Sequence, residues 1–496
     1  MSTVEHVQVP IASSAAPPEH RGDHHDVERA PQRRSWAVLA LALVAQVLVV
    51  LDISVVNTAL PTIGAELHLG GSDLQWLVTA YLLMSGGGLL LGGRIADLLS
   101  RRRVLLTGLF VFTSASLVSG FASTAGVLIG ARAAQGLGAA LMTPAALAII
   151  MTMYSGAQRA KGLALWGAVG GMGIAVGVLV GGVLTTWAGW QMIFWVNVPI
   201  GVAAIAAAMV ILPKQGTART GLSQLDLPGA AVAVAGLGGL VFGIQSAASD
   251  GWWSPRTLVV LAVSSGLLAA FTVIERRVRR PLVPPHTWRV RTLVSGTGVM
   301  LGVTGLLVGA VFLSSIFFQT VLGYSALQAG LAFLPLALII IVGTRLGSHL
   351  LGRASPRIVA TGGLTLAAAG ALLLSRAPAD ARFAIDLLPG FLVLGLGVGL
   401  VFVAVSITAM AGIPPEHAGM ASGFLMTGHE IGAALGVAVL AAVATAAGDL
   451  TTLSGAATGF SWGFVAAAIV AAGAAAAAFL AMPAARVSGS ARMHMH

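Results

Sequence analysis

Long apolar segments alternate with short polar ones along most of this chain. Each apolar segment is long enough for the roughly 20 residues that a helix needs to cross the hydrocarbon layer of a membrane. Backbone polar groups inside lipid must be hydrogen-bonded within the segment, so these segments are expected to be helices rather than strands. We predict fourteen membrane-spanning helices, at residues 36–60, 73–96, 104–122, 126–152, 162–186, 191–212, 228–247, 256–275, 293–322, 327–351, 358–376, 384–411, 418–445 and 459–482.

The composition also indicates a membrane protein. Of the 496 residues, 57% are hydrophobic and only 9% are charged, whereas an ordinary soluble domain has about 25% charged residues. So few charges cannot solvate a globular surface of this length, and lipid is expected to cover much of it. The absence of cysteine excludes disulfide bonds, thiolate metal sites and cysteine nucleophiles.

The basic residues predict how the chain is oriented. Most of the 27 Lys and Arg residues lie in the tails and in loops on one side of the predicted spans. Positive residues gather on the cytoplasmic side, so both termini are expected in the cytoplasm and the spans in the plasma membrane of a bacterial cell. This distribution accounts for the net charge of +10 without nucleic acid, because no basic patch is interleaved with aromatic residues.

Several strings along the chain form an ordered set. Residues 51–61 read LDISVVNTALP, residues 93–103 read GRIADLLSRRR, residues 132–138 read RAAQGLG, and residues 190–201 read WQMIFWVNVPIG. In this order and spacing they resemble the motifs of the major facilitator superfamily, in its fourteen-span drug:proton antiporter branch. The resemblance extends over most of residues 36–482.

The resemblance implies an all-α integral membrane fold in which two six-helix bundles surround a central cavity, with two further helices inserted between them. The expected divisions are a disordered cytoplasmic tail (1–35), a first bundle (36–212), the inserted pair with its loops (213–292), a second bundle (293–482) and a cytoplasmic C-terminal tail (483–496). It also implies a secondary transporter that needs no cofactor and uses the proton gradient as its energy source. We expect the protein to function as a monomer surrounded by membrane lipids.

Charged side chains inside the spans are costly, at about 2.5–3.5 kcal/mol each on insertion scales, and are therefore candidates for function. Asp52 is expected to face the bundle interior and to exchange a proton; a structural hydrogen bond to a neighbouring helix is the alternative. Arg132 cannot lose its charge and needs a counter-ion or carbonyl groups. It lies three residues before Gln135, so both side chains share one face of the helix. The resemblance implies that Arg132 tunes an acidic partner or relays the effect of the proton, as part of the proton-coupling set. The alternative is a fixed contact that only holds helices together.

Glu430 is the third candidate for proton coupling, and it could instead receive a cationic substrate or simply pack between helices. His429 points about 100° away around the same helix, so no direct contact between the two is expected. Polar and adaptable side chains within the spans are assigned to the substrate cavity. They are Asn57, Gln135, Gln319, Met426 and His429.

The turn after the second span is expected to act as a cytoplasmic latch. Gly93, Asp97, Arg101, Arg102 and Arg103 match the motif of the resembled family there, and they would pair with helix ends or charges of neighbouring spans when the outer gate is open. The alternative is that the arginines only set the topology, which leaves Asp97 and Gly93 less well explained.

Glycines in the fifth span recur at four-residue steps. Gly173, Gly177 and Gly181, followed by Gly182, form a row that lets another helix approach closely, and we expect this helix to come from across the interface between the two bundles.

The chain is therefore predicted to export hydrophobic or cationic, drug-like small molecules in exchange for protons by alternating access. A transporter of the same fold that exports a lipid or a metabolite made by the cell is the alternative. A membrane enzyme is disfavoured because the sequence holds no phosphate-binding G-x-x-x-x-G-K-[ST] loop, no H-E-x-x-H metal motif and no other recognisable catalytic set.

Overall fold

The structure of the protein is a computed structural model, and it describes residues 32–154, 156–213, 226–278, 281–282, 287–410, 413 and 418–484. Nearly all of this part is helical. The α-helices are α1 (Gln32–Leu67), α2 (Gly71–Leu98), α3 (Arg101–Gly120), α4 (Ala125–Met153), α5 (Gly156–Ala188), α6 (Met192–Trp195), α7 (Asn197–Ile211), α8 (Leu227–Asp250), α9 (Pro255–Arg277), α10 (Arg291–Ile316), α11 (Ala326–Leu350), α12 (Pro356–Leu374), α13 (Leu388–Met410), α14 (Ala418–Ala447) and α15 (Leu453–Ala481). Shorter turns are η2 (Thr287–Arg289), η3 (Phe317–Val321) and η4 (Phe383–Leu387). The predicted tails lie almost wholly outside the described residues.

Helices occupy every predicted span. Eleven candidate spans in the described part are long and apolar enough to cross a membrane. One of them, Met192–Ile211, contains both α6 and α7. Pro199 explains the break at Val196, because its nitrogen cannot donate to the carbonyl of Trp195 one turn earlier. The predicted spans 73–96, 162–186 and 228–247 coincide with α2, α5 and α8, and the total of fourteen remains a prediction.

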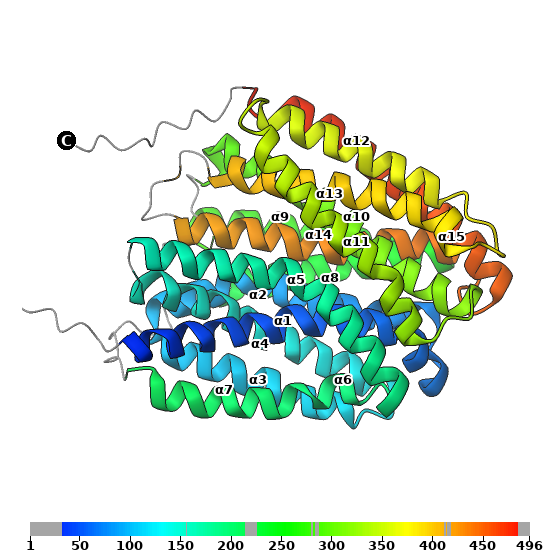
Figure 1. Cartoon of the computed structure of the whole chain (residues 1–496). Coiled ribbons are helices and arrows are strands. Elements are labelled where there is room, and N and C mark those ends of the chain that lie inside the picture. The colour runs from blue at the N-terminus through cyan, green and yellow to red at the C-terminus, as the bar shows by residue number, and fades with distance from the viewer. Residues whose placement is uncertain are drawn as a thin grey trace, which may run out of the picture.

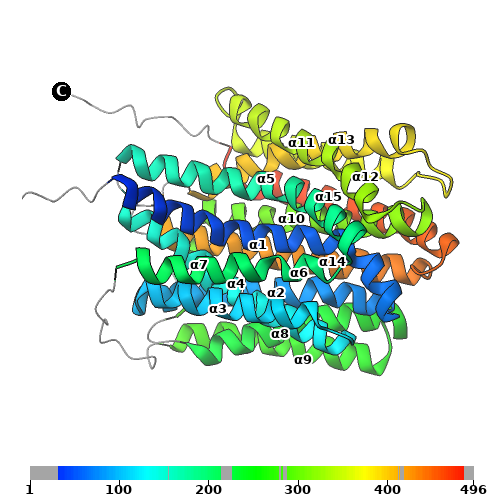
Figure 2. The same cartoon turned by 60° about the horizontal axis from the view of Figure 1, so that its bottom comes forward.

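The helices form two groups along the chain. Helices α1 to α7 pack mainly on one another, as do α10 to α15, and the two groups occupy the lower and upper parts of Figure 1. Helices α8 and α9 pair with each other, and α8 also contacts α2 of the first group and α14 of the second. Figure 2 shows this pair along one flank of the bundle. We call the two groups the first half and the second half.

Close approach of α4 to its neighbours in the first half depends on two glycines. A side-chain carbon added to Gly136 would lie 2.4 Å from the Tyr81 carbonyl oxygen of α2. One added to Gly138 would lie 2.7 Å from the Phe112 nitrogen of α3. Small residues allow such backbone contacts between membrane helices. Helix α4 is therefore held between α2 and α3, in the position that its polar side chains need.

The two halves are bonded together at the end far from the chain termini. Ser315 donates through Oγ to the Asn57 carbonyl oxygen, and Gln319 donates through Nε2 to the Thr58 carbonyl oxygen at 2.9 Å. Nearby, the Leu327 backbone N–H of α11 donates to Thr186 Oγ1 of α5 at 3.2 Å. We call these contacts the distal seam.

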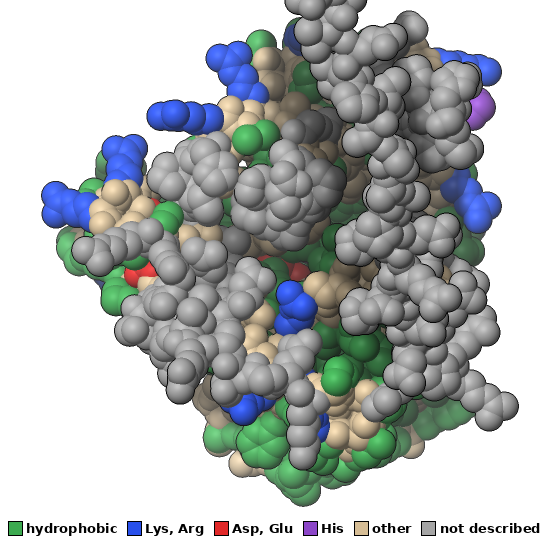
Figure 3. Space-filling model, turned by 90° about the vertical axis from the view of Figure 1, so that its left-hand side faces the viewer, with side chains coloured by type: hydrophobic (Ala, Val, Ile, Leu, Met, Phe, Trp, Pro, Cys, Tyr) green, Lys and Arg blue, Asp and Glu red, His purple; other side chains and the backbone are tan. Residues whose placement is uncertain are grey.

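The opposite end differs in shape and charge. Both ends of the described chain lie there, at the left of Figure 1. Figure 3 shows arginine side chains around the rim of this face, and between its described parts the face is hollowed, with hydrophobic side chains visible in its depth. The molecule is thus closed at the distal seam and hollowed at the end that carries the termini.

Candidate functional site

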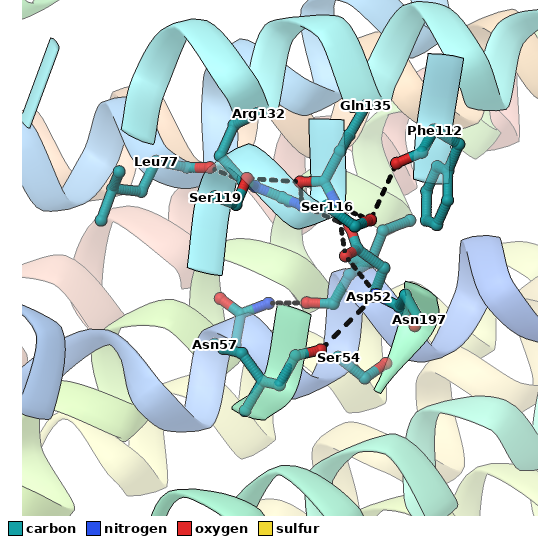
Figure 4. A network of polar contacts seen from close by, with 12 residues as sticks. Asp52, Ser54, Asn57, Leu77, Phe112, Ser116, Ser119, Arg132, Gln135 and Asn197 are labelled. Carbon is teal, nitrogen blue, oxygen red and sulfur yellow. Dashed lines mark hydrogen bonds and ion pairs between the residues drawn. The ribbon is translucent and has the colours of Figure 1, made fainter. Parts of the chain in front are cut away.

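A buried ion pair lies at the centre of the first half. Asp52 of α1 and Arg132 of α4 are 2% and 1% exposed, and Arg132 Nη1 pairs with Asp52 Oδ2. The other carboxylate oxygen, Oδ1, accepts hydrogen bonds from Gln135 Nε2 at 3.0 Å and from Asn197 Nδ2 at 3.3 Å. Figure 4 shows these side chains pointing toward one another from α1, α4 and α7. Both carboxylate oxygens of Asp52 are therefore bonded.

The guanidinium of Arg132 is held on several sides. Its Nε donates to the Leu77 carbonyl oxygen of α2 at 3.0 Å, and its Nη1 also donates to Gln135 Oε1 at 3.0 Å. The Tyr81 ring lies 4.4 Å from the guanidinium carbon. An aromatic face at this distance stabilises a cation. Arg132 thus has the counter-ion and the carbonyl group that its permanent charge requires.

Gln135 extends the network into α3. Its Nε2 also donates to Ser116 Oγ at 2.8 Å, and Ser119 Oγ donates to its Oε1 at 3.5 Å. Ser116 in turn donates to the Phe112 carbonyl oxygen at 2.8 Å. Helices α1, α2, α3, α4 and α7 are all joined through this one network (Figure 4). A change of charge on Asp52 would therefore be felt by five helices of the first half.

Glu430 lies on the other side of the interface between the halves. It is 8% exposed on α14, and a side-chain carbon added to Gly86 of α2 would lie 2.6 Å from its Cβ. Within the described part of the chain, Glu430 Oε2 has no hydrogen-bond partner. The Nδ1 of His429 lies 3.7 Å from Glu430 Oε1. The two side chains approach each other to this distance but form no hydrogen bond, because His429 Nδ1 also has no hydrogen-bond partner among the described residues.

The other cavity candidates have different surroundings. Gln135 is fully buried in the ion-pair network. Gln319 belongs to the distal seam, and Asn57 contributes its carbonyl oxygen there while its Nδ2 donates to the Ile53 carbonyl oxygen at 2.9 Å. Met426 is 37% exposed. The residues assigned to the cavity therefore have three different surroundings. Gln135 lies in the ion-pair network, Asn57 and Gln319 lie at the distal seam, and Met426 lies on an exposed helix face.

The turn between α2 and α3 contains the proposed latch. Arg102 donates through Nη2 to the Met209 carbonyl oxygen in the last turn of α7 at 2.6 Å. Arg103 is exposed and Arg101 half-buried, while a carbon added to Gly93 would contact Pro144 at 3.9 Å. The Asp97 side chain lies outside the described residues. The contact of Arg102 is with a helix end, as expected, but this helix belongs to the same half.

The glycine row of α5 faces two partners. Carbons added to Gly173, Gly177 and Gly181 would meet Val50, Ser54 and Thr58 of α1, in the same half. A carbon added to Gly182 would lie 2.7 Å from the Ala326 carbonyl oxygen of α11. The prediction of close approach across the interface is correct for Gly182 and wrong for the other three. Successive residues point to different sides of a helix, so Gly181 and Gly182 contact different neighbours.

Four members of the site were missed by the sequence analysis. Tyr81, Ser116 and Ser119 were not singled out, and Asn197 was noted only within its motif. Their signal is modest: each is a polar group within a predicted span, where such groups are uncommon. Within the described part, no three or more His, Cys, Asp or Glu residues gather in a way that could hold a metal ion.

A separate apolar groove with a cavity volume of about 150 Å³ lies within the second half. Its lining comes from α10, α14 and α15 and includes Leu301, Gly305, Leu306, Gly436, Val439 and Val470. No residue of the ion-pair network lines it, so it is distinct from the site around Asp52.

A multi-pass helical bundle with a buried ion pair, one bonded end and one hollowed end has the architecture of a membrane transporter. The family model of the Major Facilitator Superfamily matches residues 42–437. The chain belongs to the major facilitator superfamily.

Relatives and solved structures agree with this membership. The puromycin resistance protein pur8 of Streptomyces alboniger is 40% identical, over 84% of this chain and 83% of its own. The cephamycin export protein CmcT of Amycolatopsis lactamdurans is 38% identical, over 82% and 84%. The fold is similar to that of a bacterial homologue of the human lysosomal transporter Spinster in an inward-facing, unoccupied conformation, with a TM-score of 0.61, 19% identity, and coverage of 91% and 97%.

Proposed function

We propose that this protein exports hydrophobic or cationic, antibiotic-like small molecules in exchange for protons by alternating access. The names of its relatives support the substrate class, since they include a resistance protein for puromycin and an export protein for cephamycin. The observation that carries the proton coupling is the buried pair of Asp52 and Arg132. A carboxyl group in such a place can change its charge, whereas the arginine cannot.

Protonation of Asp52 would release Arg132 from its counter-ion. The neutral carboxyl keeps hydrogen bonds to Gln135 and Asn197 but no longer offsets the guanidinium charge. The charge of Arg132 then becomes costly in place, and its helix moves relative to α1. Deprotonation restores the pair. One proton thus selects between two arrangements of the first half.

Helix α1 connects the ion pair to the distal seam. Asn57 and Thr58 follow Asp52 by five and six residues, which corresponds to about 8 Å along a helix. Their carbonyl oxygens accept the hydrogen bonds from Ser315 and Gln319 of the second half. A tilt of α1 that follows protonation of Asp52 would therefore weaken the seam. This links proton uptake to opening of the distal end.

The positive rim supports an orientation with both termini in the cytoplasm. The hollowed end then receives substrate from the cytoplasm or the inner lipid leaflet, and the distal seam closes the outer side. Glu430 is the second carboxyl group of the mechanism, and it binds either a proton or the positive group of a substrate. The protein works as a monomer without a cofactor, with 36–212 and 293–482 as its two moving bundles and 213–292 as the inserted pair.

Efflux from proteoliposomes tests the proposal. Radiolabelled puromycin is followed under an imposed pH gradient and without one, for the wild type, Asp52→Asn and Glu430→Gln. We expect gradient-driven transport to fall at least about tenfold in Asp52→Asn, which corresponds to about 1.4 kcal/mol of lost coupling.

Asp250→Asn is the matched control, because Asp250 pairs with Arg256 at 3.2 Å on the exposed surface. It should transport like the wild type. If neither Asp52→Asn nor Glu430→Gln alters gradient-driven transport, the two carboxyls do not carry the proton and the mechanism is wrong.

A further inference from the structure

Tyr81 of α2 lies between charged groups that belong to different halves. It is 0% exposed, and its ring covers the Arg132 guanidinium at 4.4 Å. Its hydroxyl is within electrostatic range of Asp52 in the first half and of Glu430 in the second. Helix α2 makes this possible because it packs on both α4 and α14. The Tyr81 side chain therefore covers the ion pair and comes from a helix that also packs on the helix of the second carboxyl.

The Tyr81 hydroxyl is an unused hydrogen-bonding group. It is buried, and within the described residues it has no partner. In the same part of the chain, Glu430 Oε2 and Thr427 Oγ1 of α14 also lack partners. A buried phenol without a partner is costly and requires an explanation. A hydrogen bond between the α2 donor and an α14 acceptor, made in another conformation, would satisfy both groups.

Few other charges act on this hydroxyl. Arg132 comes from α4, Asp52 from α1 and Glu430 from α14. His429 stands beside Glu430 at 3.7 Å and is the further titratable group of α14 there. No charged group of α3 or α8 in the described chain acts on it. The hydroxyl therefore responds mainly to the ionisation of the two carboxyls.

We propose that Tyr81 is a positioning residue that couples Glu430 to the Asp52–Arg132 pair across the interface between the halves. When Glu430 is ionised and the halves shift, the Tyr81 O–H donates to its carboxylate, and the ring moves with the hydroxyl. Because this ring covers Arg132, the movement changes how well Arg132 reaches Asp52. A neutral Glu430 accepts the hydrogen bond more weakly. Protonation of Glu430, or binding of a cation to it, therefore changes the position of the Tyr81 ring and with it the Asp52–Arg132 pair in the first half. The inference rests on the proposed proton-coupled function.

Tyr81→Phe isolates the hydroxyl, because the ring over Arg132 is kept. We expect puromycin exchange without a gradient to stay within about twofold of wild type, and gradient-driven efflux to fall about tenfold, with an altered dependence on pH. Tyr81→Leu also removes the ring, so both exchange and gradient-driven efflux should fall. Tyr154→Phe removes the hydroxyl of another buried tyrosine, at the end of α4, and should behave like the wild type.

A double variant tests the route through Glu430. If the hydroxyl acts through this carboxylate, Tyr81→Phe combined with Glu430→Gln loses no more coupling than the more severe single variant, whereas independent effects would multiply. Multiplying losses, or a Tyr81→Phe variant with the pH profile of the wild type, would overturn the inference. Absence of gradient-driven efflux in the wild type itself would instead refute the proposed function.

Discussion

Asn57 of α1 accepts, through its backbone carbonyl, a hydrogen bond from Ser315 of α10 in the other half of the molecule. This bond joins the helix that carries Asp52 to a helix with which it otherwise has limited contact. Because the acceptor belongs to the backbone, it depends on the position of the whole helix rather than on one rotamer. A tilt of α1 would therefore lengthen or break this hydrogen bond.

Neutralising one member of the buried pair should destabilise the protein more than neutralising both. Asp52→Asn leaves Arg132 buried without a counter-ion and places an amide donor against it, which costs about 3–5 kcal/mol. In Asp52→Asn/Arg132→Gln the uncompensated charge is gone, so part of the stability should return. Thermal unfolding in detergent measures both. A double variant less stable than Asp52→Asn would contradict a simple charge-pair explanation.

Enlarging Gly182 should open the distal seam. A side chain at this position would overlap the backbone of Ala326 and Leu327, and overpacking of this kind costs about 1–3 kcal/mol. Gly182→Leu should therefore shift the population toward the open seam by roughly tenfold, since about 1.4 kcal/mol corresponds to that factor.

The natural absence of cysteine gives a direct measurement of this opening. A single Gln319→Cys, whose side chain lies in the seam, should react faster with an impermeant maleimide when Gly182→Leu is present. Gly298→Leu is the control, because an added carbon there has no neighbour within 4 Å among the described atoms. Equal labelling rates in both backgrounds would show that the α5–α11 contact does not hold the seam closed.

Gly177 should affect stability within the first half rather than contact between halves. An added carbon would lie 2.6 Å from Ser54 Cβ, so Gly177→Val pushes α5 from α1, at a cost of about 1–3 kcal/mol. We expect a lower midpoint of thermal unfolding, with seam labelling less affected than in Gly182→Leu. Gly130→Val is the matched control, because space around Gly130 is open.

The loop between α14 and α15 should give a small pH-dependent contribution to stability. Hydrogen bonds from the Thr451 backbone and hydroxyl hold the pKa of Asp449 below its usual value. A depressed pKa in the folded state means that this contribution is present at neutral pH and is lost as the pH falls through that pKa. Asp449→Asn should therefore unfold slightly earlier than the wild type at pH 7 and equally at low pH. Because Asp449 is fully exposed, the difference in unfolding midpoint between Asp449→Asn and the wild type should be small. If this difference at low pH equals or exceeds that at pH 7, the prediction is wrong.

The sequence predicts individual helices better than it predicts what each helix contacts. Apolar length identifies the spans, and the three-residue spacing correctly places Arg132 and Gln135 on one face. The rotation of one helix against another depends on contacts such as Gly136 with the Tyr81 carbonyl group. Spacing along one helix contains no information about such a partner. For this reason Tyr81 was missed, and Gly173, Gly177 and Gly181 of α5 were assigned to the wrong neighbour.

The two junctions between the halves differ in whether an inserted helix separates them from the surrounding lipid. Helix α8 contacts both α2 and α14, so it covers the junction of the halves on that side. At the other junction, between α5 and α11, the described helix that contacts both is α1, which belongs to the first half, and neither inserted helix packs there. A hydrophobic molecule dissolved in the bilayer therefore has one shielded and one unshielded approach to the interior, and lateral loading is expected to take place beside α5 and α11.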